Sequence, residues 1–229
     1  MKWSFVPNGN YQRVEELVNE LLTESSGIEL AAAVAPYGRG KSTAAARIIT
    51  MNPCTVYTYF EPRFSLAGLI REIAFSIGST RPQSTQASVE VIKREISNKR
   101  RVVLVDEADQ MSLKHLNQLR AFHDLYGIPI VLIGEDALLS KLDREGRLMS
   151  RVRKVLKFQP VTQADVTIFY KQSLGLSLTP EHATALQRHS RGDFRRVIVD
   201  AAKAERLMKI NGLKAVNDSL VHEVCKDER

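Results

Sequence analysis

The sequence predicts a mainly parallel, three-layer α/β domain followed by a small all-helical domain. Two observations predict it: short apolar segments alternate with helical patterns over the first two thirds of the chain, and the apolar segments then stop. The boundary falls near Gln159-Pro160, which gives an α/β core over residues 1–159 and a helical domain over residues 160–229. A chain of 229 residues is long enough for both.

Five short segments have the apolar character of buried strands. Four are rich in β-branched residues, whereas the first is rich in alanine and is placed partly by its context. The five are Leu30–Ala35, Thr55–Tyr59, Val102–Asp106, Ile130–Ile133 and Val152–Phe158. Because helices alternate with them, the sheet is expected to be parallel with helices on both faces.

Helical periodicity fills the gaps between these strands. One apolar face consists of Leu66, Leu69, Ile70, Ile73, Ala74 and Ile77. A second consists of Val89, Ile92 and Ile96, and a third steps by three residues through Leu113, Leu116, Leu119, Phe122 and Leu125. The polar, proline-containing stretch Arg81–Gln86 is predicted to be a loop.

The predicted helical domain is marked by its capping residues. Thr162 with Asp165 resembles a capping pair, and Thr179-Pro180 provides a cap followed by a first-turn proline. A third helix is outlined by Phe194, Val197, Ile198, Ala201 and Met208, ending at Asn211-Gly212. A fourth is suggested by Val216, Leu220, Val221 and Val224.

The composition excludes several classes of protein. At 44% hydrophobic and 26% charged residues, wholesale disorder is excluded, and no apolar run is long enough to span a bilayer. Cys54 and Cys225 give neither a disulfide framework nor zinc-ligand spacing. We therefore expect a cytoplasmic protein of a bacterial host cell, with no membrane partner. The net charge of +7 permits nucleic acid as a partner without requiring it.

The first strand runs into a turn with the residue order that triphosphate binding needs. Glycines let backbone N–H groups converge on phosphate, and the following helix presents its positive end. The expected nucleotide contacts are Ala35, Gly38, Arg39, Gly40, Lys41, Ser42 and Thr43. Lys41 would reach the β- and γ-phosphates of ATP, and the Ser42 hydroxyl would ligate Mg²⁺. Ala35 replaces the usual glycine, which is compatible with a negative φ; an ordinary turn is the alternative.

The third strand ends in Asp106-Glu107-Ala108-Asp109, at the edge where ligands collect in parallel sheets. Asp106 is a candidate to hold Mg²⁺ through water, and Glu107 is a candidate to polarise the attacking water. Helix capping is the alternative, and it applies most directly to Asp109. Together with the phosphate-binding turn, these carboxylates indicate a P-loop nucleotide hydrolase with a glutamate base.

The two motifs together resemble those of the AAA+ ATPases. A helicase core shares the Asp-Glu-Ala-Asp sequence but would need a second recombinase-like domain. The resemblance implies that residues 160–229 form an AAA+ lid and that Arg191–Arg196 opens its sensor-2 helix. Arg195 would then contact the γ-phosphate, with Arg196 as a backup; a solvated basic helix start is the alternative. Glu135 occupies the sensor-1 position, where the family usually has Asn or Thr.

In the AAA+ pattern, the region between the fourth and fifth strands carries an arginine finger that completes a neighbouring subunit's ATP site. The resemblance implies Arg147 and Arg151 as the best candidates, with Arg144 behind them. A solvated or ion-paired arginine is the alternative at each position.

A narrower resemblance rests on Leu119-Arg120-Ala121-Phe122-His123-Asp124, followed by Gly127-Ile128-Pro129 and an apolar strand. This pattern is similar to the transposition AAA+ ATPases, typified by the phage Mu B protein and the Tn7 C protein. It implies a phage or mobile-element ATPase that assembles on double-stranded DNA as a ring or helical filament, selects a target and activates a transposase. A helicase loader or replication initiator is the alternative, and a membrane-associated secretion ATPase is a third.

The same resemblance places DNA in a pore lined by the segments after the second strand and after the carboxylate pair. The cationic residues there are Arg63, Arg71, Arg81 and Lys114. A rival surface consists of Lys93, Arg94, Lys99, Arg100 and Arg101, for which a solvated helix end is the simpler interpretation. Contacts would be mainly to phosphates, so little sequence preference is expected.

Overall fold

The computed structural model describes residues 5–23 and 30–226, which fall into two compact units. The α/β unit contains the described residues of 10–36 together with 41–158. The helical unit contains the described residues before Asn10, the turn Tyr37–Gly40 and the chain from Gln159 onward. No helix among the described residues is long and apolar enough to cross a membrane.

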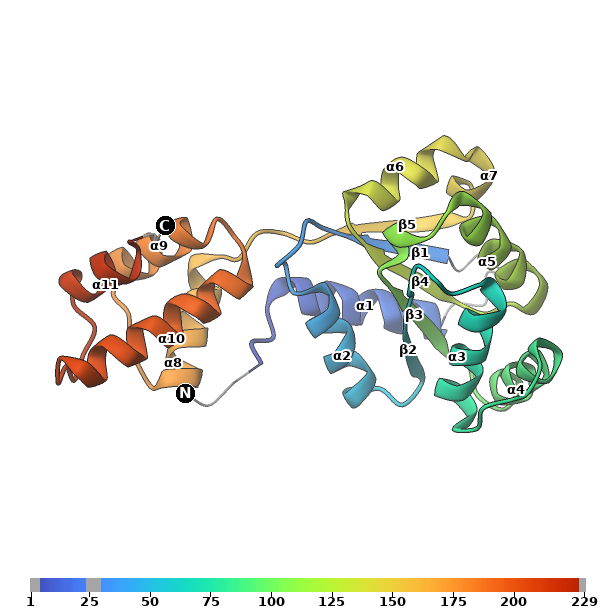
Figure 1. The fold of residues 1–229 in the computed structure, drawn as a ribbon, viewed down its shortest axis with the longest axis horizontal. Coiled ribbons are helices and arrows are strands. Elements are labelled where there is room, and N and C mark those ends of the chain that lie inside the picture. Colours follow the sequence, from blue (N-terminus) through green and yellow to red (C-terminus); the bar gives the residue numbers. More distant parts are fainter. Residues whose placement is uncertain (1–4, 24–29, 227–229) are drawn as a thin grey trace. The chain divides into compact units, whose positions relative to one another are not determined.

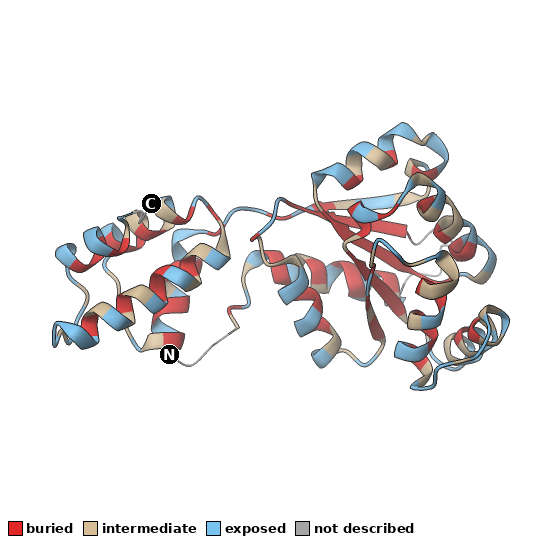
Figure 2. Cartoon of the chain, in the orientation of Figure 1, coloured by how far each residue is buried: buried red, intermediate tan, exposed pale blue. Residues whose placement is uncertain are grey.

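An all-parallel five-stranded sheet, in the order β2-β3-β4-β1-β5, forms the centre of the α/β unit (Figure 1). The strands are β1 (Leu30–Val34), β2 (Thr55–Tyr59), β3 (Val102–Asp106), β4 (Ile130–Gly134) and β5 (Val152–Lys157). β1, β3 and β4 are buried at every position, as Figure 2 shows. Strands buried on both faces need cover on both faces, which the helices supply. The predicted fold class is confirmed.

The helices of the α/β unit bury apolar side chains in the core of this unit. They are α1 (Gly9–Thr23), α2 (Lys41–Met51), α3 (Leu66–Gly78), α4 (Thr85–Asn98), α5 (Leu113–Tyr126), α6 (Asp136–Arg144) and α7 (Gly146–Met149), with the 3₁₀ turn η1 (Ala108–Gln110). α1, α6 and α7 were not predicted, although α1 buries Val14, Leu17, Val18 and Leu21 at helical spacing. The predicted loop Arg81–Gln86 is wrong in its last two residues, because Ser84 accepts a hydrogen bond from Ala87 N–H and so starts α4 at Thr85.

The third predicted apolar face is wrong at one end. Leu116, Leu119 and Phe122 are buried, but Leu125 is 71% exposed. A step of three residues turns an α-helix by about 300° rather than a full circle, so a run of such steps drifts around the helix. After four steps from Leu113 the side chain has moved to the solvent side.

Four helices build the helical unit: α8 (Gln163–Leu174), α9 (Pro180–Ser190), α10 (Phe194–Ile210) and α11 (Asp218–Val224). The Thr162–Asp165 capping box is present in both directions, and Thr179 caps α9 with Pro180 in the first turn. Buried side chains from all four helices share one core, including Val166, Phe169, Leu186, Val197 and Leu220. Local capping chemistry thus sets where the helices of this unit begin.

Candidate active site

The turn between β1 and α2 has the backbone that its glycines predict. Gly38 and Gly40 have φ angles of 76° and 85°, whereas Ala35 is not among the residues with positive φ. Ala35 is buried, and its N–H donates to the carbonyl of Gly134 at 3.2 Å. Alanine therefore continues the strand pairing at a position where glycine's freedom is not needed.

Within the helical unit, this turn contacts the start of α10. Phe194 N–H donates to the Gly38 carbonyl at 2.8 Å, and a Cβ on Gly38 would collide with the Asp193 carboxylate. The Arg39 guanidinium lies so close to Gly192 that no Cβ would fit there, and its Nη1 is buried without a hydrogen-bond partner. Glycine is thus required at position 38 both by the positive φ and by the closeness of the Asp193 carboxylate.

Lys41 opens α2 and points back over the turn. Its Nζ donates to the carbonyls of Ala35 (2.7 Å) and Pro36 (3.0 Å). Burial lowers the pKa of Lys41 from its ordinary value, and the carboxylates of Glu135, Asp106, Asp109 and Glu107 act in the opposite direction. The structure therefore brings the lysine after β1 and the carboxylates after β3 to the same edge of the sheet.

Asp106 is 1% exposed at the end of β3. Its Oδ2 accepts a hydrogen bond from Tyr57 Oη at 2.7 Å, and its Oδ1 accepts from Glu107 N–H at 2.9 Å. Burial, followed by the bond to Asp106, raises the pKa of Tyr57. Tyr57 was not predicted as a site residue. The alternation along β2 predicts the face of the strand on which Tyr57 lies. Its contact with Asp106 depends on the parallel pairing of β2 with β3, which the sequence alone does not give.

Glu107 departs from ordinary backbone geometry. Its φ of 56° and ψ of 32° are left-handed, which a residue with a Cβ rarely adopts, and no side-chain cap bond compensates at η1. Burial raises the pKa of Glu107, the carboxylates of Asp109 and Asp106 add to the rise, and Lys41 opposes it. Strained backbone of this kind clusters at functional sites.

Asp109 ties η1 to the strand end of β4. Its Oδ1 accepts from Glu135 N–H at 2.9 Å, and a Cβ on Gly134 would lie 2.6 Å from that same oxygen. Lys141 of α6 donates to the carbonyls of Asp109 and Met111, a role that was not predicted and that no sequence pattern indicates. The Glu135 side chain makes no capping bond at α6. Asp109 thus links η1 to the start of α6 through a backbone hydrogen bond, and it is not the N-cap residue of η1, α5 or α6.

The donor set at this edge fits a Mg²⁺-triphosphate. The first turn of α2 offers N–H groups, and it contains the half-buried Lys41 and the exposed Ser42 and Thr43. Nothing lies within 4 Å of the Cβ position of Gly40. The described residues contain no cluster of three His, Cys, Asp or Glu that could hold a metal alone. Mg²⁺ typically takes one or two carboxylates plus phosphate oxygens, so the buried Asp106 carboxylate suits it.

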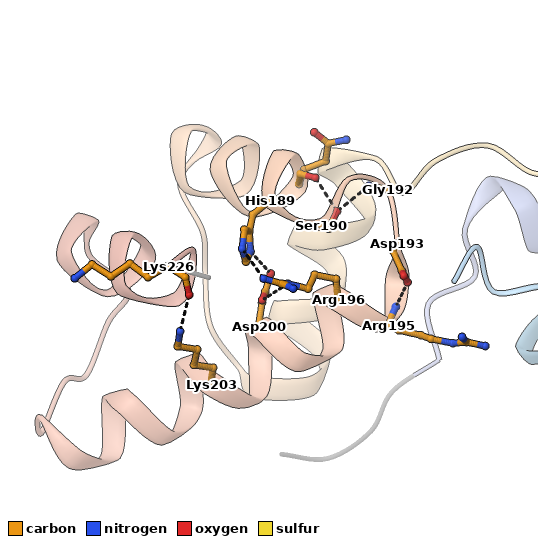
Figure 3. A network of polar contacts seen from close by, with 10 residues as sticks. His189, Ser190, Gly192, Asp193, Arg195, Arg196, Asp200, Lys203 and Lys226 are labelled. Atoms are coloured by element: carbon orange, nitrogen blue, oxygen red, sulfur yellow. Dashed lines mark hydrogen bonds and ion pairs between the residues drawn. The ribbon is translucent and has the colours of Figure 1, made fainter. Parts of the chain in front are cut away.

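The two sensor-2 arginines differ sharply (Figure 3). Arg196 points into a buried network in which its Nη2 lies 2.9 Å from His189 Nε2 and its Nε lies 3.5 Å from Asp200 Oδ1. His189 Nδ1 completes the ring 2.8 Å from Asp200 Oδ2, and burial raises the pKa of Asp200. Arg195 is exposed and extends away from this network, while its N–H bonds the capping carboxylate of Asp193 at 2.7 Å. The geometry leaves Arg195 available and engages Arg196 within the unit.

The candidate arginine fingers also differ in their partners. Arg144 and Arg147 are exposed on α6 and α7, and neither side chain forms an ion pair with any residue that the structure describes. Arg151, just before β5, lies with Nε 3.2 Å from Asp124 Oδ1.

The four predicted DNA-contacting cations do not form one compact cluster. Arg63 precedes α3 and Arg81 follows it, and a 13-residue helix separates its ends by about 18 Å. Arg63 pairs with Glu61 at 2.8 Å, and Arg81 lies over the Phe75 ring at 4.7 Å. Arg71 and Lys114 are exposed and have no ion pair among the described residues. The cations are therefore spread along α3 and at the start of α5.

The rival cationic surface is engaged with local partners at four of its five positions. Lys93 lies over Tyr126, Arg94 pairs with Glu95, Arg100 donates to the Leu21 carbonyl and Arg101 donates to the Pro53 carbonyl. Lys99 is the exposed C-cap of α4.

Comparison with known proteins gives a family model described as an AAA domain, which matches residues 25–142, just over half of the 229-residue chain. A "Potential ATP-binding protein" of Staphylococcus aureus is 30% identical over 135 residues, covering 55% of this chain and 49% of its own. The Mu-like prophage FluMu DNA transposition protein B of Haemophilus influenzae is 31% identical over 133 residues, covering 55% and 46%. The matched regions thus span about half the length of these curated relatives.

Solved structures share the fold at lower identity. The Aeropyrum pernix ORC2 protein, in its ADPNP-ADP complexes, aligns with a TM-score of 0.66 and 16% identity over 97% of this chain and 67% of its own. The Thermotoga maritima RuvB Holliday junction branch migration motor aligns with a TM-score of 0.62 and 16% identity, covering 94% and 67%. At this identity the likeness shows the P-loop NTPase fold alone.

Proposed function

The chain belongs to the AAA domain family, and from that premise we propose that it is an ATPase that assembles on double-stranded DNA in its ATP-bound state and activates a transposase. One observation carries the ATPase part of the proposal. Lys41 and the carboxylates of Asp106 and Glu107 meet at one edge of the sheet, where both carboxylates oppose the lowering of the Lys41 pKa by burial. A cation for the phosphates and a carboxylate for the water are the two groups that phosphoryl transfer requires.

Each residue has one proposed task. Backbone N–H groups of residues 38–43 and the Lys41 ammonium bind the phosphates, so Lys41 exchanges its two carbonyl partners for phosphate oxygens. Ser42 and Asp106 hold Mg²⁺, which supplies charge neutralisation on the transferred phosphoryl group. The Glu107 carboxylate accepts a proton from water aligned with the γ-phosphate. Arg195 contacts the γ-phosphate from the helical unit.

The division of the chain into an α/β unit and a helical unit supports a proposed separation of tasks. We propose that residues 1–159 form the nucleotide-binding core and residues 160–229 a lid that carries Arg195. Arg196 is excluded from a direct phosphate role in this proposal, because its guanidinium is engaged with His189 and Asp200.

The DNA and transposase parts rest on the relative from Haemophilus influenzae, a DNA transposition protein by name, and on the net charge of +7. Exposed Arg71 and Lys114 are the strongest candidates for phosphate contacts, because neither is held by a carboxylate among the described residues. Assembly on DNA would make several weak contacts act together.

Negative-stain imaging with duplex DNA tests the proposal. Regular rings or filaments are expected with ATP and not with ADP. The Lys41→Ala protein should form neither, because one charge-assisted phosphate contact contributes about 1.5–3 kcal/mol and the site also loses its anchor. Assemblies that form equally well with ADP, or with Lys41→Ala, would contradict the proposal.

A stimulation assay separates the proposed function from its alternative. We expect a transposase, and not a replicative helicase, to accelerate ATP hydrolysis by the DNA-bound protein. The opposite result would identify a helicase loader or replication initiator, with the same ATP site.

A further inference from the structure

Asp124 joins two arginines near the end of α5. Its Oδ2 accepts a hydrogen bond from Arg120 Nη1 at 2.6 Å, and its Oδ1 lies 3.2 Å from Nε of Arg151. We propose that Asp124, supported by Arg120, is a positioning residue that orients Arg151 toward the ATP of a neighbouring subunit. This inference rests on the proposed ATPase function and concerns how its arginine finger is held.

The contact leaves the phosphate-binding end of Arg151 available. The guanidinium of Arg151 is attracted to Asp124 as an ion pair, with Nε 3.2 Å from Oδ1. None of its five N–H donors forms a hydrogen bond with a described residue, and the side chain is 42% exposed. The ion pair biases where the guanidinium lies and leaves its planar fork available for bidentate phosphate recognition.

Asp124 is itself fixed from two sides. Arg120 lies four residues earlier on the same face of α5, with a side chain that is 23% exposed. The end of the helix is pinned because Gly127 N–H donates to the His123 carbonyl at 2.8 Å and the buried His123 Nδ1 lies 2.6 Å from the Ile128 carbonyl. The motif Leu-Arg-x-x-His-Asp therefore supplies the carboxylate, its second cation and the histidine that fixes the turn.

The alternative finger, Arg147, has no such support. It is exposed on α7 and forms no ion pair with a described residue, so ordering it at an interface would cost the rotamer freedom of a long side chain. A contribution to stability does not explain the Asp124 cluster either, because partly exposed ion pairs stabilise proteins little. Orientation of Arg151 is the role that the geometry favours.

Assemblies that mix two variants test the proposal, because one variant supplies the arginine finger and the other supplies the ATP site. Lys41→Ala subunits do not assemble on their own, but they are expected to join assemblies that ATP-bound neighbours form; they lack a working nucleotide site and keep Arg151. Arg151→Ala subunits keep the site but lack the finger. With duplex DNA and ATP, an equimolar mixture should hydrolyse ATP faster than either protein alone. Replacing the finger donor by Lys41→Ala/Asp124→Asn should reduce this recovered rate by about 10- to 100-fold, the size expected when a catalytic group is misplaced by about 1 Å.

Three controls separate positioning from a general structural defect. Asp124→Asn subunits used as the site donor should be rescued by Lys41→Ala neighbours, whereas a folding defect would act in both directions. Lys41→Ala/Asp143→Asn, which changes an exposed carboxylate on α6, should donate its finger as well as Lys41→Ala. Asp124→Glu should restore part of the lost rate, because it keeps the charge.

The outcomes separate a failure of the proposed ATPase function from a failure of the positioning role of Asp124. If the unaltered protein does not hydrolyse ATP, the proposed function itself is wrong. If it does, and Lys41→Ala/Asp124→Asn subunits donate the finger as well as Lys41→Ala subunits, the positioning role is overturned while the ATPase stands. The inference is also overturned if Arg147→Ala, rather than Arg151→Ala, is the variant that neighbours rescue.

Discussion

The starts of the four helices of the helical unit and the turn after β3 follow opposite rules. Thr162, Thr179, Asp193 and Asn217 each accept a backbone hydrogen bond at the first turn of a helix, in extended or near-extended backbone. Glu107 occupies the equivalent position before η1 with left-handed backbone and no side-chain cap. Residues that satisfy local rules stabilise the fold, and a residue that breaks them at the ligand-binding edge of a parallel sheet is a candidate for function.

The same contrast holds for buried carboxylates. Asp200 of the helical unit is enclosed by His189 and Arg196, so its oxygens have cationic or polar partners within the unit. Among the residues that the structure describes, Asp106 accepts hydrogen bonds only from the neutral Tyr57 hydroxyl and from the Glu107 N–H. A carboxylate oxygen accepts more than one bond, so Asp106 retains capacity for a hydrated cation. The surroundings of Asp200 indicate a structural role, and those of Asp106 support its proposed role as a ligand.

The largest expected effect is on catalysis at Glu107. Glu107→Gln keeps the shape and the backbone strain but removes the carboxylate, so ATP should still bind while turnover falls by about 10²–10⁴-fold. Steady-state ATPase assays with a nucleotide-binding titration measure both. Glu90→Gln, on the exposed side of α4, is the matched control and should keep the parent rate. Parent-rate turnover in Glu107→Gln would remove this residue as the base.

The second prediction is that glycine and alanine change their order of stability between Glu107 and Glu90. At the positive φ of Glu107, the glycine variant should be more stable than the alanine variant by about 1 kcal/mol, because a Cβ is strained there. At Glu90, in the middle of α4, alanine should be more stable than glycine by about 1 kcal/mol. Urea unfolding of the four variants measures both differences. The same order at both positions would show that Glu107 stores no backbone strain.

These contrasts explain what could be predicted from sequence. The strands were predictable because β1, β3 and β4 are buried on both faces and read as continuous apolar runs, and Thr162 and Thr179 were predictable because capping is local. Tyr57 and Lys141 were not predictable, since their contacts to Asp106 and Asp109 depend on strand register and on how α6 packs. The left-handed backbone of Glu107 likewise follows from tertiary constraints rather than from its residue type.

A smaller effect is expected at Thr162, the N-cap residue of α8. Thr162→Ala removes the hydroxyl that accepts from Asp165 N–H and should lower the stability of the helical unit by about 1 kcal/mol. Thr167→Ala is the matched control: its hydroxyl bonds the Gln163 carbonyl within α8, where alanine is the better helix former, so no loss is expected. Thermal and urea unfolding followed by circular dichroism measure the change. Equal losses in both variants would mean that the capping box contributes nothing specific.

The smallest expected effect is on the pH profile of kcat/KM, which reports the pKa values of the essential groups in the free enzyme. The pH range of activity should be narrower than the ordinary pKa values of glutamate and lysine would give. Glu107 must be ionised to accept a proton, and burial raises its pKa above the ordinary 4.5, so activity should fall on the acid side at a pH above that value. Lys41 must be protonated to bind phosphate, and burial lowers its pKa below the ordinary 10.5, so the alkaline fall should begin earlier. Lys41→Arg tests the second assignment, because a guanidinium stays protonated and should move the alkaline limb upward in whatever activity remains. An alkaline limb that stays in place in this variant would assign it to another group, and an acid limb at or below 4.5 would contradict the role of burial at Glu107.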